Sequence, residues 1–250
     1  MCGISGSRYS HAALHHLVGR CAAGLAAQGF GPGAVLLMVA PNAPEWAIAA
    51  LAAMAAGGAV GAAHPASSAT ELASRLHAVG ARYVFTTPAL LASVRGAVAG
   101  APGVASAGLV QTIVLGEADD TLAFTTLLAC ADAEPRPPAG IDSLALLPLS
   151  PDAARAAHGK PLTQRALLHQ LAPLQRSHPL GPGDLALALL PMGQLAAFVQ
   201  ATLSPLAQGA AVVTLPTFER TLVDQTIAKH RITHLLRAPP QQGLIASRTA

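Results

Sequence analysis

The stretch AVLLMVAPNAPEWAIAALAAMAAGGAVGAA, residues 34–63, contains the unit from which the fold can be predicted. Residues 34–40 form a continuous apolar run, which is typical of a parallel strand buried on both faces. Asn42 and Pro44 suit an N-cap and a first helical turn, and Gly57 and Gly58 suit the end of that helix. A second apolar run at 59–65 predicts another strand, so the stretch predicts a strand–helix–strand unit of a parallel sheet.

The same alternation continues along the rest of the chain. Helices are predicted at 11–28, ended by Gly29, at 67–79, capped by Ser68 or Thr70 and stopped by Gly80, and at 88–99, with strands at 81–87 and 110–116. Beyond the Pro-rich stretch 131–142, strands at 143–150, 184–191, 210–216 and 232–240 alternate with helices near 163–175, 195–209 and 220–231. We therefore predict an α/β fold of two stacked α/β subdomains with mostly parallel sheets, residues 1–131 and 143–250, joined by a Pro-rich linker at 132–142.

The composition excludes several classes of protein. Hydrophobic residues make up 52% and charged residues 11%, so the chain is globular and not disordered, and its scarce charge favours self-association. The net charge of +3 comes from scattered arginines and two lysines without neighbouring aromatics, which argues against a nucleic-acid partner. Three widely spaced cysteines and an N-terminus without an apolar signal core favour a reducing compartment, and we expect a cytoplasmic protein.

An uncharged stretch at 46–63 is long enough to cross a membrane. It consists mostly of Ala and Gly, which insert weakly, and Gly57-Gly58 divides it. We therefore interpret it as a buried helix, turn and strand, and expect no membrane span.

The segment PLSPDAARAAHGKPLT, residues 148–163, lies between a predicted strand and a predicted helix, where α/β proteins place phosphate-binding loops. Ser150 suits an N-cap, Pro151 a first helical residue and Gly159 a helix stop, so we predict a short helix at 151–158. Its N-terminus would bind anions poorly, because Pro151 has no N–H and Asp152 repels phosphate.

Other candidate sites are weaker. His11, His15 and His16 lie within one helical turn, and His230 and His234 are spaced i, i+4, but neither group has a third metal ligand nearby, so we expect no metal site. The GFGPG sequence at 29–33 precedes its strand and is a turn, and the chain has no Gly-x-Ser-x-Gly motif. We assign no catalytic residue.

An ordered set of motifs resembles the acyl-adenylate-forming (AMP-binding) ligases, and most closely their 4-coumarate–CoA-ligase-like branch. The motifs extend from about residue 9 to 245: RYSHAALHHLVGRCAAGLAAQGFGPG (8–33), APNAPEWAIAALAAMAAGGAV (40–60), ELASRLHAVGARYVFTT (71–87), LALLP (144–148), LTQRALL (162–168), LLPMGQ (189–194), LAQGAAVVTLPTFE (206–219) and IAKHRITHLLRAPP (227–240). The resemblance implies the fold of the family's N-terminal region, a carboxylic acid substrate, and ATP, Mg and CoA as cofactors.

The family's phosphate loop reads Ser-Ser-Gly-Thr-Thr-Gly-Leu-Pro-Lys-Gly, and this chain departs from it. Only Ser150 and Gly159 are kept in an ungapped alignment, Asp152 replaces a glycine, and His158 stands where the family has Lys. The resemblance leaves Ser150, Gly159, Lys160 and Thr163 as remnants of nucleotide binding. Gly193 and Gln194 are the acyl-pocket candidates, at positions where the family has an aromatic residue and His.

The resemblance also ends before the family's aromatic–Gly–x–Thr–Glu adenine motif and its C-terminal catalytic Lys. We therefore expect a truncated or degenerate acid–CoA ligase with little or no activity and no cofactor of its own. Whether the chain is an enzyme stays open. The alternatives are a non-catalytic binding or scaffold protein on the same fold, or a translated remnant without a selected function. The sequence does not identify an acid substrate.

Overall fold

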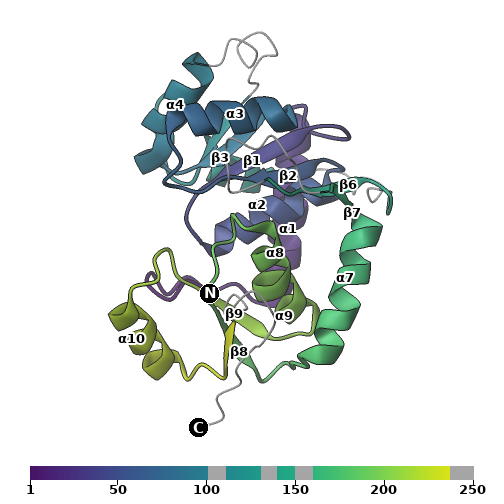
Figure 1. Cartoon of the computed structure of the whole chain (residues 1–250), viewed down its shortest axis with the longest axis vertical. Helices are drawn as coiled ribbons and strands as arrows, with labels where there is room; N and C mark the ends of the chain where they lie inside the picture. Colours follow the sequence, from purple (N-terminus) through teal and green to yellow (C-terminus); the bar gives the residue numbers. More distant parts are fainter. Residues whose placement is uncertain (101–110, 131–139, 150–159, 237–250) are drawn as a thin grey trace.

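A computed structural model describes residues 1–100, 111–130, 140–149 and 160–236 of the chain (Figure 1). The predicted helix at 151–158 lies outside these residues, as do Ser150 and Gly159. Among the described helices, none combines the length and hydropathy that a membrane crossing requires.

Two sheets organise the described elements. The larger sheet has seven strands in the order β5-β4-β3-β1-β2-β6-β7, and the smaller has the order β10-β8-β9. All of their pairings are parallel except that of β6 with β7, which confirms the predicted α/β fold with mostly parallel sheets. The strands are β1 (Val35–Val39), β2 (Ala59–Ala62), β3 (Tyr83–Thr86), β4 (Gln111–Val114), β5 (Leu122–Ala123), β6 (Leu144–Leu147), β7 (Leu162–Thr163), β8 (Leu185–Ala188), β9 (Ala211–Thr214) and β10 (His234–Leu236).

Helices cover both faces of the larger sheet, as Figure 1 shows. The first face carries α1 and α2, and the opposite face carries α3 and α4. The helices are α1 (His11–Ala27), α2 (Pro44–Ala55), α3 (Ala69–Val79), η1 (Pro88–Leu90), α4 (Leu91–Ala99), α6 (Phe124–Leu128), α7 (Gln164–Ser177), α8 (Leu195–Phe198), the π-helical turn η2 (Val199–Leu203), α9 (Ser204–Ala207) and α10 (Arg220–His230).

The strand β1 lies between β3 and β2 in the larger sheet, and every one of its side chains is buried. Leu36 and Met38 belong to the core beneath α1 and α2, while Leu37 and Val39 belong to the core beneath α3 and α4. This alternation follows from the two-residue period of a strand. It explains why the sequence of β1 is apolar throughout.

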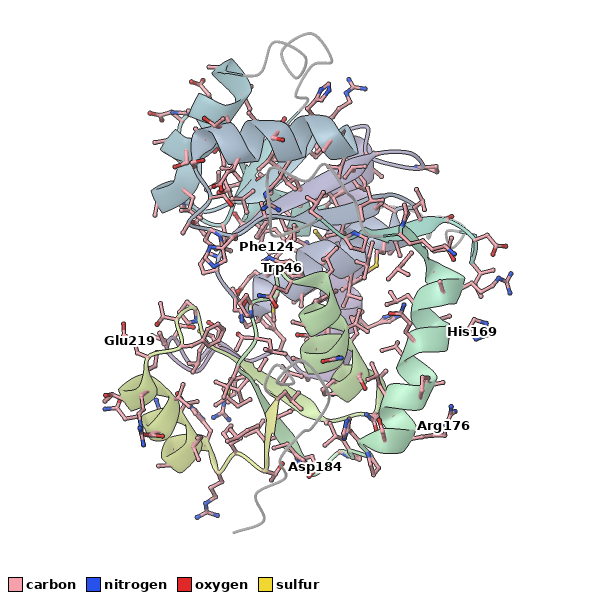
Figure 2. All side chains as sticks on the ribbon, viewed as in Figure 1. Trp46, Phe124, His169, Arg176, Asp184 and Glu219 are labelled. Atoms are coloured by element: carbon pink, nitrogen blue, oxygen red, sulfur yellow. The ribbon has the colours of Figure 1, made fainter. Side chains whose placement is uncertain are left out.

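The helix α2 joins the two halves of the molecule. Trp46 is fully buried, and its ring meets the ring of Phe198 edge to face with centroids 4.8 Å apart. Figure 2 shows Trp46 near the middle of the molecule, whereas Asp184 lies at the end formed by the smaller sheet. One apolar core therefore connects the larger sheet to the helix that follows β8.

The division of the chain into subdomains at 1–131 and 143–250 remains a prediction, but sheet membership does not follow it. The strand β6 lies after the Pro-rich stretch, yet it pairs in parallel with β2, with Val60 opposite Leu146. Ala145 and Leu146 are fully buried there, because both faces of the larger sheet are covered at β6. The strand near 143–150 thus extends the first sheet, and α7 then runs beside both halves to reach β8 (Figure 1).

The predicted capping residues of α3 are confirmed, whereas the predicted N-cap of α2 is wrong. Ser68 caps α3 with a full capping box to Glu71, and Gly80 ends that helix with a left-handed backbone at φ 59°, as expected. Asn42 is not an N-cap, because the N-cap of α2 is Ala43 and Pro44 is its first residue. The Asn42 side chain makes a long-range contact instead.

Candidate functional site

Sheets of α/β proteins bind ligands at the carboxyl ends of their parallel strands. The end of β1 leads to Asn42, and the end of β2 leads to Ala63 and His64. The end of β8 leads into the turn that begins α8, residues 189–194. The fold brings these three strand ends into direct contact.

Asn42 makes the central connection. Its Nδ2 donates to the carbonyl of Leu190 at 2.8 Å, and its Oδ1 accepts from the N–H of Met192 at 2.8 Å. The residue is only 6% exposed, so it pairs a buried donor and a buried acceptor across two sheets. This bridge fixes the backbone immediately before Gly193 and Gln194, the two acyl-pocket candidates.

Gly193 packs against the end of β2. A Cβ at this glycine would lie 3.3 Å from the carbonyl oxygen of Ala63, so a larger side chain would push the two loops apart. Gln194 is exposed, and its backbone continues the turn by donating to the Pro191 carbonyl at 2.9 Å. Its side-chain amide has no hydrogen-bond partner among the described residues, which leaves it free to meet a ligand.

The nucleotide-binding candidates lie on a different edge. Lys160 is exposed next to β7, and Thr163 ends that strand, which pairs antiparallel to β6 at the margin of the larger sheet. The Thr163 hydroxyl accepts from the Ala166 N–H at 3.2 Å and caps α7. No hydrogen bond in the described part of the chain joins Lys160 or Thr163 to Gly193 or Gln194.

The histidines singled out by their spacing lie on α1, α10 and β10. His11, His15 and His16 are exposed on α1. His230 ends α10, and His234 lies in β10 with its Nδ1 3.5 Å from Asp184 Oδ1 and 2.8 Å from Thr233 Oγ1. Within the residues that the structure describes, no three His, Cys, Asp or Glu side chains gather as a metal ion would need.

Two features of the site were not predicted from the sequence. The Asn42 bridge was missed, because a local pattern at the start of a helix gives no sign of a partner about 150 residues away. The second is a pair of buried polar atoms, Trp46 Nε1 and Thr86 Oγ1, that form no hydrogen bond with any residue that the structure describes. Polar residues inside apolar runs were the only sequence signal for them.

Comparison with known proteins gives consistent results. Residues 3–247 match the family described as AMP-binding enzyme. The chain is 30% identical over 245 residues to 4-coumarate–CoA ligase 5 of Oryza sativa subsp. japonica. The aligned region covers 95% of this chain and 44% of the relative.

Solved structures agree on the fold. A putative long-chain-fatty-acid CoA ligase from Rhodopseudomonas palustris superimposes with a TM-score of 0.82 at 20% identity, over 94% of this chain and 58% of that chain. ATP-bound MatB from the same organism gives 0.78 at 22% identity, over 93% of this chain and 44% of that one. This chain spans less than half of the length of the curated relative.

Proposed function

The chain belongs to the family of AMP-binding enzymes, and from that premise we propose that it is the N-terminal part of a 4-coumarate–CoA-ligase-like protein with little or no adenylating activity of its own. The activity of the branch is the ATP-dependent activation of a carboxylic acid. The substitutions in residues 150–159 carry the second half of the proposal.

In this proposal the turn after β8 forms one wall of an acyl pocket. Gln194 has a free, exposed amide that can donate a hydrogen bond to a carboxylate, but the amide carries no charge. Gly193 keeps the backbone close to Ala63. The pair can orient an acid without supplying the positive charge that a histidine would add.

The side chains available for a triphosphate do not fit one. The phosphate loop needs backbone N–H groups, hydroxyls and a cation, whereas this chain offers Pro151 and Asp152. The Thr163 hydroxyl already caps α7, and Lys160 is an exposed cation beyond the loop. Each lost charge-assisted hydrogen bond weakens binding by about 1.5–3 kcal/mol, and a micromolar site totals only about 8 kcal/mol. Three or four such losses remove the site.

The test is acid-dependent exchange of pyrophosphate into ATP, together with calorimetric titration of the 250-residue chain with ATP and Mg. We expect neither exchange nor saturable binding. In a second protein, residues 151–159 are replaced by the family's loop, and weak triphosphate binding should return. Saturable binding by the unaltered chain at tens of micromolar or tighter would contradict the proposal.

A second candidate function, a non-catalytic scaffold, is favoured by apolar side chains around β7. Ile141 is 45% exposed, Leu144 is 44% exposed and Leu168 is 55% exposed. Ile141 and Leu144 lie beside the start of α7, because the Ile141 carbonyl accepts from the Arg165 N–H at 2.7 Å and Leu144 pairs with Thr163, and Leu168 follows one turn later in α7. An edge strand beside exposed apolar residues favours association.

Light scattering at micromolar concentration tests whether the chain associates with itself through this region, as the scaffold function requires. Leu168→Lys should reduce the apparent mass, and Ile4→Lys should not, since Ile4 is equally exposed (54%) but lies outside this region. A monomeric wild-type chain at low salt would exclude self-association through this region.

A further inference from the structure

A cavity of about 520 Å³ lies beside the N-terminal segment, and neither Gly193 nor Gln194 lines it. Its walls come from residues 8–14, the start of α2, the strands β8 and β9, and the end of α10. The N-terminal segment lies along β9, where the Thr214 N–H donates to the Met1 carbonyl at 2.9 Å (Figure 1). The volume falls in the range of about 300–1,000 Å³ that is usual for small-molecule sites.

The mouth of the cavity is basic. Arg8, Lys229 and Arg231 line it and are exposed, and no ion pair within the described part of the chain neutralises them. The described lining contains no Asp or Glu. Glu45 adjoins it, because this carboxylate accepts a hydrogen bond from the lining residue Tyr9 at 2.7 Å. Three positive side chains and one negative side chain give the mouth a charge of +2.

The backbone of Arg231 indicates that its side chain has a function. Arg231 ends α10 in the left-handed conformation, with φ 52° and ψ 52°. Among the described residues other than glycine, only Asp120 shares a positive φ. Glycine is favoured at such a helix end, as at Gly80 after α3, because a Cβ is crowded there. Strained residues of this kind gather at binding sites, and this one places a guanidinium at the cavity.

The opposite wall of the cavity is apolar. Leu14, Leu185 and Leu206 line it and are half-buried. Leu14 packs against the core of the larger sheet, and Leu206 packs against the core of the smaller sheet. An apolar ligand body therefore gains hydrophobic contact with both halves of the molecule.

We propose that this cavity binds a phosphate monoester of an apolar alcohol. Such an ester carries about two negative charges at neutral pH, which matches the charge of the mouth, whereas a monoanion leaves one positive charge unmatched. The guanidinium groups of Arg8 and Arg231 suit the paired oxygens of a phosphate, and Lys229 adds a point charge. The same phosphate chemistry occurs in a soluble alkyl phosphate and in the headgroup of phosphatidate. The site does not depend on the adenylating activity of the chain.

Titration of the 250-residue chain with decyl phosphate and decyl sulfate at pH 8 tests the site. The two ligands share an apolar body but differ by one charge. We expect decyl phosphate to bind about tenfold more tightly, the gain of one charge-assisted hydrogen bond. Leucine-methyl NMR locates the ligand: Leu14 and Leu206 should shift, whereas Leu168, which is 55% exposed on α7, should not. Equal affinity for the two ligands, or an equal shift of Leu168, would overturn the proposal.

Variants of α10 separate binding from stability. Arg231→Gly should weaken decyl phosphate binding about tenfold, while the melting temperature stays or rises because glycine suits the left-handed backbone. Arg220→Gln is the matched control, because Arg220 lies at the other end of the same helix and pairs with Asp224 outside the cavity. Unchanged affinity in Arg231→Gly, or the same loss in Arg220→Gln, would contradict the assignment.

Co-sedimentation with phosphatidylcholine vesicles, with and without phosphatidate, distinguishes the two sources of the ester. Retention on phosphatidate vesicles that is lost in Arg231→Gly would identify a membrane lipid as the ligand. Binding of soluble decyl phosphate without retention on vesicles would identify a soluble ester. If the chain binds neither form, the proposal is wrong.

Discussion

Removing the Asn42 side chain should destabilise the fold and loosen the turn that carries Gly193 and Gln194. Asn42→Ala leaves the Leu190 carbonyl and the Met192 N–H without their partners at 2.8 Å. Each unpaired buried backbone group costs about 1–3 kcal/mol. Some water will reach the space, so we expect a loss of about 3 kcal/mol in the free energy of unfolding. For a chain of this size that corresponds to a fall of about 6–12 °C in melting temperature.

Two further variants separate the hydrogen bonds from general damage. Asn42→Asp keeps an acceptor for Met192 but places a carboxylate against the Leu190 carbonyl, and we expect it to be at least as destabilised as Asn42→Ala. Gln194→Ala removes an exposed amide from the same turn and should change stability by less than about 0.5 kcal/mol.

Urea unfolding and amide hydrogen exchange provide the measurements. Exchange at the Met192 N–H should accelerate in Asn42→Ala under native conditions, because its acceptor is gone. If Asn42→Ala unfolds within about 0.5 kcal/mol of wild type, or if Met192 remains protected, the bridge does not hold the two sheets together as described.

Two other outcomes are expected. Gly24→Ala should destabilise the fold by more than about 2 kcal/mol, because its Cβ would lie 2.6 Å from the backbone oxygen of Leu127 in α6. Gly19→Ala is the matched control: its Cβ would have no neighbour within 4 Å, and the change should stabilise α1 by about 0.5–1 kcal/mol. Thermal unfolding of both variants measures these changes. Burial raises the pKa of Cys21 to about 12. Burial also acts to raise the pKa of Cys2, but hydrogen bonds from Ser5 and from the Ile4 backbone together outweigh it and lower that pKa. Iodoacetamide at pH 8 should therefore label Cys2 at least about 100-fold faster than Cys21, as read by mass spectrometry, and similar rates would contradict this assignment.

The sequence by itself determined the local elements and their order. The strand β1, the helix α2 and the strand β2 follow from an apolar run, a proline at the first helical position and a glycine pair, all within thirty residues. The capping box of Ser68 and Glu71 and the left-handed Gly80 are likewise set by short-range geometry. Such signals depend on neighbours in the chain, so they can be predicted without the tertiary structure.

Only the tertiary structure decided which distant segments meet. Asn42 has the pattern of an N-cap, yet its side chain satisfies the backbone of the turn after β8, and the two buried hydrogen bonds together outweigh one exposed cap. The placement of β6 beside β2 is decided by the long-range packing of its apolar side chains, because the run at 144–147 shows that a strand forms but does not show which strand it pairs with.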